Sequence, residues 1–134
     1  MGRNEKELAI QMWQEIKGQI EKGKLNDCEE VYQFKRSFTE KHILNWGIVH
    51  CYLCEKFACC EDCPIACTKE TSEKYFTDFN DFQRCGYYYV ASNQTRNARK
   101  ELLVSPRSKK FKTEVRLEAC DRIIEGIKSI KENE

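Results

Sequence analysis

Apolar side chains recur every three to four residues in three stretches of the chain, which is the spacing of one face of an α-helix. In residues 4–22 the apolar positions are Leu8, Met12, Trp13, Ile16 and Ile20. In residues 28–41 they are Val31, Phe34 and Phe38. In residues 113–131 they are Val115, Ala119, Ile123, Ile127 and Ile130. The pattern therefore predicts three amphipathic helices that bury these faces in a core.

Residues with known capping preferences stand at the ends of these stretches. Asn4 precedes Glu7 by three residues, which is the spacing of a capping box. Asp27 precedes Glu30 by the same spacing. Gly23 is expected to end the first helix, because glycine adopts the left-handed conformation that closes a helix at little cost.

The middle of the chain has a less regular pattern. Tyr75, Phe76, Phe79 and Phe82 predict a helix over residues 72–85, which Gly86 would end. The aromatic run over residues 87–90 suits a short strand, with residues 102–104 as its partner. A helix over residues 94–104 is the alternative. The fold class expected is mainly α, with three to four helices around a cysteine-rich loop and one short β-hairpin.

The length of 134 residues fits one domain. Its mean hydropathy of −0.73 is polar, but 2 Trp, 6 Tyr and 7 Phe argue against general disorder. We divide the domain into a helical N-terminal part (1–45), a cysteine-rich metal-binding core (46–90), a basic loop or hairpin (91–112) and a C-terminal helix (113–134). The net charge of +1 does not by itself select nucleic acid or membrane as a partner.

The cellular compartment matters because it decides what the cysteines do. No segment approaches the roughly 20 apolar residues that a membrane span needs. The charged N-terminus lacks the apolar stretch of a signal peptide, so we expect a cytoplasmic protein. In a reducing compartment, dense cysteines bind metal more often than they form disulfides. The odd count of nine also fits a disulfide framework poorly.

Six of the nine cysteines lie within residues 51–67. Two Cys-x-x-Cys pairs stand out there, and their members are Cys51, Cys54, Cys60 and Cys63. Two residues between ligands allow one tight turn to direct both thiolates at one ion, and a second turn completes a tetrahedron around Zn²⁺. A closed site of four cysteines leaves no position for a reactive water, so the metal is expected to be structural. Cys28 and Cys120 lie on predicted helices, where core packing is expected.

The ligand set has alternatives. The less certain candidates are Cys59, Cys67, Cys85 and His50. A redox pair is a rival interpretation, but the pattern lacks the βαβ setting of such motifs. An iron–sulfur cluster is a further rival. Only Cys63-Pro64 matches the end of the ferredoxin run, and the spacing from Cys54 to Cys59 is too long for its middle.

The cysteine region resembles a group of small proteins from phages and Gram-positive bacteria. The matching residues are Cys51-Tyr-Leu-Cys54, the aromatic Phe57, the run from Cys60 through Cys63-Pro64-Ile65, and Cys85-Gly86 before tyrosines. The resemblance covers about 40 residues, from 50 to 89. It implies a shared metal-binding core and a mobile-element setting, and it supplies no activity. Cys59 and Cys67 depart from the pattern, which blurs the ligand assignment.

Basic residues cluster after the tyrosines. They are Arg96, Arg99, Lys100, Arg107, Lys109, Lys110 and Lys112, with Glu101 as the single acid between them. Such cations meet phosphates, and neighbouring aromatic rings stack on bases, so this segment is a candidate nucleic-acid surface. The competing interpretation is a solvated loop that balances acidic residues elsewhere, since the pI of 7.5 is low for a dedicated binder.

Three classes of function follow. The first is a zinc-stabilised module that binds nucleic acid through residues 96–112. The second is a phage or mobile-element factor that inhibits a host defence protein, using Trp46 and Tyr87, Tyr88 and Tyr89 as binding hot spots. An enzyme is not expected, because the sequence has no nucleophile–base set, no phosphate loop and no deaminase motif.

Overall fold

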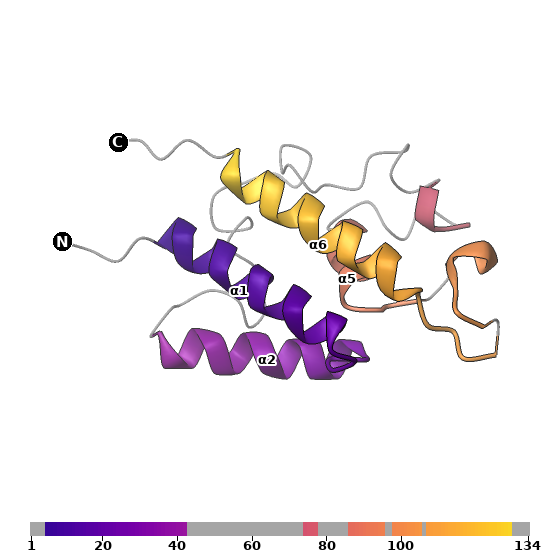
Figure 1. Ribbon diagram of the computed structural model, residues 1–134, viewed down its shortest axis with the longest axis horizontal. Helices are drawn as coiled ribbons and strands as arrows, with labels where there is room; N and C mark the ends of the chain where they lie inside the picture. Colours follow the sequence, from indigo (N-terminus) through magenta and orange to yellow (C-terminus); the bar gives the residue numbers. More distant parts are fainter. Residues whose placement is uncertain (1–4, 43–73, 78–85, 96–97, 106, 130–134) are drawn as a thin grey trace.

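The computed structural model describes residues 5–42, 74–77, 86–95, 98–105 and 107–129 (Figure 1). The elements in these ranges are α1 (Glu5–Glu21), α2 (Cys28–Lys41), α5 (Gly86–Ala91), the 3₁₀ helix η3 (Lys100–Leu102) and α6 (Thr113–Lys128). The described part of the chain is therefore mainly helical, as predicted. The predicted helices over residues 4–22, 28–41 and 113–131 correspond to α1, α2 and α6.

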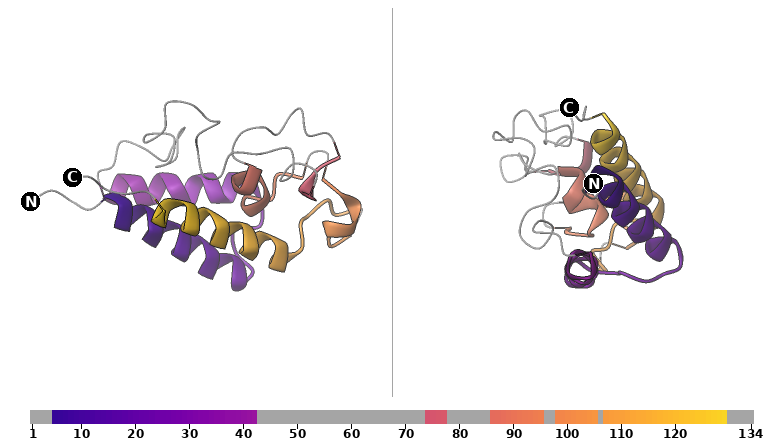
Figure 2. Two further views of the ribbon diagram at one scale, coloured as in Figure 1. Left: turned by 90° about the horizontal axis from the view of Figure 1, so that it is seen from above. Right: turned by 90° about the vertical axis from the view of Figure 1, so that its left-hand side faces the viewer.

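The first and last helices lie side by side although they are far apart in the sequence. α1 packs against α6 along its length and also contacts α2. Both neighbours of α1 run in the opposite direction to it (Figure 1). The short helix α5 packs against α6, and the two lie next to each other in both further views (Figure 2). α6 is thus held between an N-terminal helix and a helix from the middle of the chain.

The predicted apolar faces form the core. Met12, Trp13 and Ile16 of α1 are buried, as are Val31 and Phe38 of α2. From α6 the buried apolar side chains are Ala119, Cys120, Ile123, Ile124 and Ile127. At the margins Leu8, Phe34 and Val115 are partly buried against this cluster. The helical periodicity therefore identified the buried face of each long helix.

Two of the predicted helix ends are confirmed. The Asp27 carboxylate accepts a hydrogen bond from the Glu30 amide at 2.9 Å and caps α2. The Glu30 carboxylate reaches back to the Asn26 amide, one residue before the position in an ideal capping box. Gly23 has φ of +81°, and the Gly23 amide donates to the Ile20 carbonyl at 3.0 Å. The Lys24 amide then donates to the Gln19 carbonyl at 2.9 Å, which completes a Schellman motif. Asn4 lies outside the described residues.

The expected strand over residues 87–90 is wrong, because these residues form α5. Aromatic and β-branched side chains favour strands by propensity, but packing overrides propensity in short segments. The Tyr88 ring makes an edge contact with Trp13 at 5.9 Å between centroids, and Tyr87 makes one with Tyr75 at 5.9 Å. Val90 and Ala91 are fully buried. A helical turn allows successive aromatic residues to reach separate parts of the core.

The ends of α5 also differ from expectation. Gly86 begins this helix and does not end one. Asn93 terminates α5 with φ of +64°, a left-handed conformation that asparagine tolerates better than most residues. The Asn93 amide donates to the Val90 carbonyl at 3.0 Å, and the Gln94 amide donates to the Tyr89 carbonyl at 2.8 Å. These bonds form a second Schellman motif.

Only residues 74–77 of the predicted helix over 72–85 are described. Tyr75 is helical there, but Phe76 pairs with Ala98 in an isolated antiparallel bridge. The Arg99 amide supports this pairing by donating to the Tyr75 carbonyl at 2.9 Å. The helical alternative for residues 94–104 is confirmed only for η3. The connection expected over residues 42–50 lies outside the described residues after His42, which ends α2.

Two basic side chains of the described ranges are buried in this core. Lys35 of α2 is 3% exposed, and its ammonium lies 4.3 Å from the centroid of the Tyr88 ring. Arg116 of α6 is 5% exposed and hydrogen-bonds to backbone carbonyls. Burial lowers the pKa of Arg116, and the charges of Cys120, Asp27 and Glu30 oppose this effect. Both cations therefore connect helices rather than face solvent.

None of the helices in the described ranges combines the length and the apolar character that a membrane crossing requires.

Candidate functional site

The basic segment forms a hairpin-like structure after η3. The Val104 amide donates to the Lys110 carbonyl at 2.7 Å, and the Lys112 amide donates to the Leu102 carbonyl at 3.0 Å. These bonds flank an antiparallel bridge between Leu103 and Phe111. We call residues 102–105 and 107–112 the basic hairpin. The expected pairing of residues 102–104 with the tyrosine run is wrong, because 87–90 is helical and Leu103 forms an isolated bridge with Phe111 instead.

Local hydrogen bonds define the tip of the basic hairpin. The Lys109 amide donates to the Ser105 carbonyl at 3.0 Å, and the Ser108 hydroxyl donates to the same oxygen at 3.0 Å. The Arg107 amide donates to the Ser105 hydroxyl at 3.2 Å. Lys109 adopts φ of +52°, which reverses the chain direction. Ser105 therefore organises a turn that contains Arg107 and Lys109, and Lys110 follows directly after it.

The base of the basic hairpin is anchored in the core through Phe111 and Asn93. Phe111 is 2% exposed, and its ring meets Phe76 edge-on at 6.2 Å between centroids. The Phe111 amide donates to the Asn93 side-chain oxygen at 2.7 Å. The Asn93 side-chain nitrogen donates to the Asn26 carbonyl at 2.7 Å. One asparagine thus connects the basic hairpin, the end of α5 and the α1–α2 connection.

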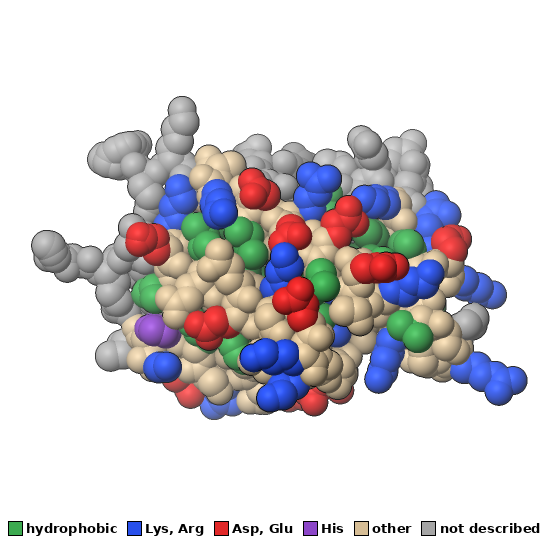
Figure 3. Space-filling view, in the orientation of Figure 1, with side chains coloured by type: hydrophobic (Ala, Val, Ile, Leu, Met, Phe, Trp, Pro, Cys, Tyr) green, Lys and Arg blue, Asp and Glu red, His purple; other side chains and the backbone are tan. Residues whose placement is uncertain are grey.

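The charges of the basic hairpin are open to solvent. Arg107, Lys109 and Lys110 are exposed, and Lys112 is half-buried. Within the ranges that the structure describes, these four side chains make no ion pair. The basic hairpin contains no acidic residue, and the nearest acids along the chain are Glu101 and Glu114. Basic side chains project from this end of the molecule in Figure 3.

The other residues predicted to contact nucleic acid differ from one another in exposure. Lys100 is exposed in η3, whereas Arg99 is half-buried beside Tyr75. Arg96 lies outside the described residues. The three tyrosines of α5 are half-buried and pack against the core. Their rings are therefore engaged within the protein and are not presented as a free stacking surface.

The predicted metal ligands lie outside the described residues. They are Cys51, Cys54, Cys60 and Cys63, with the alternatives His50, Cys59, Cys67 and Cys85. Within the described ranges, no cluster of three His, Cys, Asp or Glu side chains suits a metal ion.

The two described cysteines differ in environment. Cys120 is buried as expected, and burial raises the pKa of its thiol to about 12. The expected core position of Cys28 is wrong, because Cys28 is exposed at the first residue of α2. The apolar face of that helix is formed instead by positions 31, 34 and 38, which leaves position 28 outside the packing interface.

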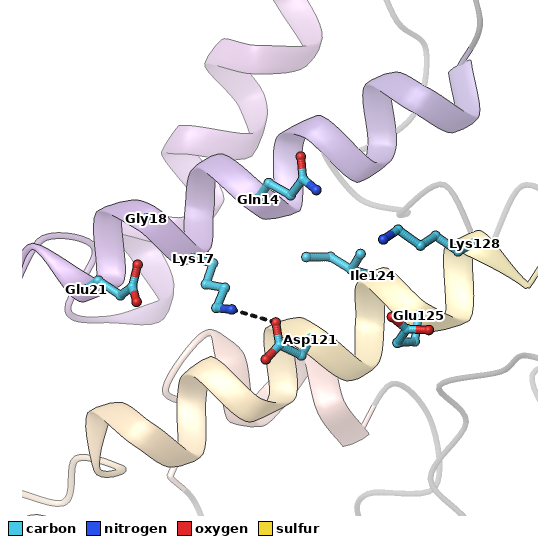
Figure 4. Close-up of a pocket in the computed structure, with 8 residues that line it drawn as sticks. All are labelled: Gln14, Lys17, Gly18, Glu21, Asp121, Ile124, Glu125 and Lys128. Atoms are coloured by element: carbon cyan, nitrogen blue, oxygen red, sulfur yellow. Dashed lines mark hydrogen bonds and ion pairs between the residues drawn. The ribbon is translucent and has the colours of Figure 1, made fainter.

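A surface groove of about 430 Å³ lies between α1 and α6 (Figure 4). The Lys17 ammonium and the Asp121 carboxylate meet across it at 2.7 Å. This hydrogen bond raises the pKa of Lys17. The other residues that line the groove are Gln14, Gly18, Glu21, Ile124, Glu125 and Lys128. Because acidic and basic side chains both line the groove, its charge favours neither an anionic nor a cationic ligand.

Several residues that organise these features were not singled out by the sequence pattern. Arg116, Lys35 and Asn93 hold the helices and the basic hairpin in place. Asn93 offered one recognisable signal, since asparagine is favoured at left-handed helix ends. The buried cations offered none, because their partners are carbonyls and rings from distant segments.

Comparisons with protein-family models, with curated proteins and with solved structures give no match to this chain.

Proposed function

We propose that the protein is a small, zinc-stabilised, non-enzymatic module that binds nucleic acid through the basic hairpin. The observation that carries the proposal is the tip of the basic hairpin, where Arg107, Lys109 and Lys110 are exposed without an ion-pair partner in the described ranges. Surface cations that lack acidic partners are free to neutralise phosphates. The anchoring through Phe111 keeps them together at one end of the helical body.

Binding of this kind depends strongly on salt. Each phosphate contact releases condensed counterions, so the logarithm of the association constant falls by about 0.9 per contact for each unit of log salt concentration. Four cations of the basic hairpin predict a slope of about −2 to −4 on duplex DNA. The affinity itself is then weak at physiological salt and much tighter at low salt.

Fluorescence anisotropy with labelled duplex DNA over a series of salt concentrations tests the proposal. Charge reversal in the triple variant Arg107→Glu, Lys109→Glu and Lys110→Glu is expected to abolish binding at low salt. A matched control reverses three exposed lysines elsewhere, in the variant Lys22→Glu, Lys24→Glu and Lys41→Glu. The two variants have the same net charge, so equal losses of affinity contradict a specific role of the basic hairpin.

The zinc part of the proposal is supported by the cysteine spacing. Cys51, Cys54, Cys60 and Cys63 supply four thiolates, and soft sulfur ligands favour zinc over hard cations. The binding energy of such a site also stabilises the fold. A polar chain with a mean hydropathy of −0.73 gains from that contribution.

Metal analysis of protein purified without oxygen tests the zinc proposal. One zinc per chain is expected, and a chelator is expected to lower Tm. The variant Cys51→Ser should lose the metal, whereas Cys28→Ser should retain it because Cys28 is outside the motif and exposed on α2. Iron with visible colour contradicts zinc and points to an iron–sulfur cluster. Metal-free, fully folded protein contradicts both.

A host-protein inhibitor is the alternative function. Its candidate hot spots Tyr87, Tyr88 and Tyr89 are half-buried against the core, which reduces the surface that they offer to a partner. It predicts stoichiometric capture of one protein and no salt-sensitive binding of DNA. The anisotropy experiment therefore separates the two functions.

A further inference from the structure

The aromatic side chains of the described ranges differ sharply from the cations in exposure. Phe111, Phe76 and Tyr75 are at most 2% exposed. The tyrosines of α5 are half-buried and packed on the core. Within the described part of the chain, every aromatic residue is buried or half-buried, whereas the cations at the tip of the basic hairpin are exposed.

This difference bears on the form of nucleic acid that the basic hairpin suits. Proteins that bind single strands gain about 1–3 kcal/mol for each base stacked on an aromatic ring. Among the described residues, the surface around the basic hairpin supplies charge without exposed rings of this kind. Its exposed apolar side chain is Val104, at 63%, which lacks a planar face on which a base can stack. Attraction to phosphate charge is then the main source of affinity, and duplex DNA carries twice the charge per unit length of one of its strands.

Hydrogen bonds also hold the backbone of the basic hairpin in place. Its two sides are joined by backbone hydrogen bonds on either side of the Leu103–Phe111 bridge. Asn93 fixes the base, because its side chain accepts from Phe111 and donates to the Asn26 carbonyl. Its backbone is held in the left-handed conformation by the end of α5. A backbone held in this way keeps the attachment points of the cations together, so less conformational entropy is lost on binding to the regular phosphate array of a duplex.

We propose that the basic hairpin is a preorganised contact for the phosphate backbone of double-stranded DNA, and that Asn93 is its positioning residue. This inference rests on the proposed function and specifies its substrate class. Arg107, Lys109 and Lys110 supply the charge. Asn93 holds the base of the basic hairpin in position without contacting the DNA.

The first experiment compares a labelled duplex with its component single strand at equal length and equal salt. Binding to the duplex is expected to be about tenfold tighter, because charge density favours it and stacking does not oppose it. Equal or tighter binding of the single strand overturns the inference and leaves the proposed function standing. Absence of binding to both overturns the proposed function itself. Binding to vesicles of anionic phospholipid in preference to the duplex overturns both.

The second experiment separates charge from geometry. The variant Arg107→Ala, Lys109→Ala and Lys110→Ala removes three positive charges without adding negative ones. It is expected to reduce the steepness of the salt dependence by about 0.9 for each phosphate that the protein no longer neutralises. The variant Asn93→Gly keeps the left-handed backbone and removes both side-chain hydrogen bonds. It is expected to weaken duplex binding about three- to tenfold while the salt slope stays near that of the wild type.

Further measurements keep the role of Asn93 testable if Asn93→Gly is less stable. The variant Asn93→Asp retains the acceptor for the Phe111 amide and the tolerance for a left-handed backbone, so it should keep more of the affinity than Asn93→Gly. Hydrogen exchange of the Phe111 amide should accelerate in Asn93→Gly. An unchanged duplex affinity in Asn93→Gly, with that amide released, overturns the positioning role.

Discussion

Arg116 shows how a single buried cation can join three segments. Its Nε donates to the Ala91 carbonyl at 2.9 Å, and its Nη2 donates to the Leu25 carbonyl at 2.7 Å. The first oxygen belongs to the last residue of α5 and the second to the α1–α2 connection. A planar guanidinium suits this task because it directs several donors at fixed angles.

Removal of the Arg116 charge should destabilise the protein. Arg116→Met fills similar space but leaves one buried and one partly buried carbonyl without these partners, which costs about 2–4 kcal/mol in the free energy of unfolding. Arg116→Lys should show an intermediate loss of stability, because one ammonium group cannot reach both carbonyls as the two guanidinium nitrogens do. Urea unfolding measures both variants. The control Arg122→Met is exposed on the same helix and should stay within about 0.5 kcal/mol of the wild type. A loss for Arg116→Met that is no larger than the control contradicts this role.

Tyr75 presents the opposite situation, a buried polar group without a partner. Its side chain is 1% exposed, and its hydroxyl makes no hydrogen bond in the described structure. Burial raises the pKa of this phenol, and the nearby Glu118 carboxylate raises it further without reaching hydrogen-bond geometry. A buried hydroxyl in this state has lost its water without compensation.

The variant Tyr75→Phe should therefore increase stability. The ring contacts with Phe76 and Tyr87 remain, and the unsatisfied hydroxyl disappears. We expect a gain of about 1 kcal/mol in the free energy of unfolding, measured by urea titration. A control, Tyr87→Phe, removes a hydroxyl from a half-buried ring and should change stability little. A clear loss in Tyr75→Phe contradicts the absence of a partner for the hydroxyl.

At the scale of elements, two glycines in α1 and just after it differ in backbone conformation. A Cβ at either Gly18 or Gly23 would meet no atom within 4 Å. Gly18 is in the helix interior, whereas Gly23 has φ of +81° just after the helix. Neither position obstructs an added Cβ, so we expect the backbone angle to decide the effect of a side chain.

Alanine at these two positions should have opposite effects. Gly18→Ala is expected to stabilise by about 0.5–1 kcal/mol, because alanine loses less backbone entropy in a helix. Gly23→Ala is expected to destabilise by about 1–2 kcal/mol, because an L-residue is strained in the left-handed region. Thermal and urea unfolding of the two single variants measure the difference. Changes of the same sign contradict this account of the two glycines.

The long helices could be predicted from the sequence because each contains a complete apolar stripe and local end signals. Asp27 and Gly23 act through neighbours within five residues, so their role is visible in the sequence itself. α5 could not be predicted in this way. Six residues are too few to show a helical period, and the conformation of its tyrosines depends on Trp13 and Tyr75 far away in the chain.

The candidate site was predictable in charge but not in shape. The cluster of cations is evident from the sequence, but its presentation depends on the pairing of 102–104 with 110–112. The signal was present, since apolar residues 102–104 and Phe111 flank a polar turn. However, the tyrosine run has high strand propensity, so residues 102–104 were predicted to pair with it instead of with 110–112. The contribution of Asn93 depends on a contact across 67 residues and is not visible in any local pattern.

At the scale of the molecule, the pairing of α1 with α6 makes the folded body depend on both ends of the chain. Cys120 lies in that core, and burial raises the pKa of its thiol from 9.0 to about 12. Tyr75 is a second buried acid whose pKa lies above its ordinary value of 10.0. Both groups are neutral when protonated. The folded protein therefore retains their protons at a pH where the unfolded chain releases them.

The consequence is a loss of global stability in alkali. Below pH 9 both states of the protein keep the Cys120 proton, so its contribution to stability is complete. As the pH rises from 9 to about 12, the unfolded chain ionises first, and the free energy of unfolding falls by up to about 1.4 kcal/mol per pH unit from this thiol. Urea unfolding at a series of pH values above 8 measures the fall.

Two cysteine variants isolate the contribution of the core. Cys120→Ala removes the buried thiol, so its free energy of unfolding should decline less steeply with pH than that of the wild type. Cys28→Ala is the matched control, because it removes a thiol that lies outside the core, exposed at the start of α2. Because the other seven cysteines are present in both variants, their titration cancels in the comparison. Parallel curves for all three proteins would mean that the Cys120 thiol is equally acidic in the folded and unfolded states, contrary to its burial between α1 and α6.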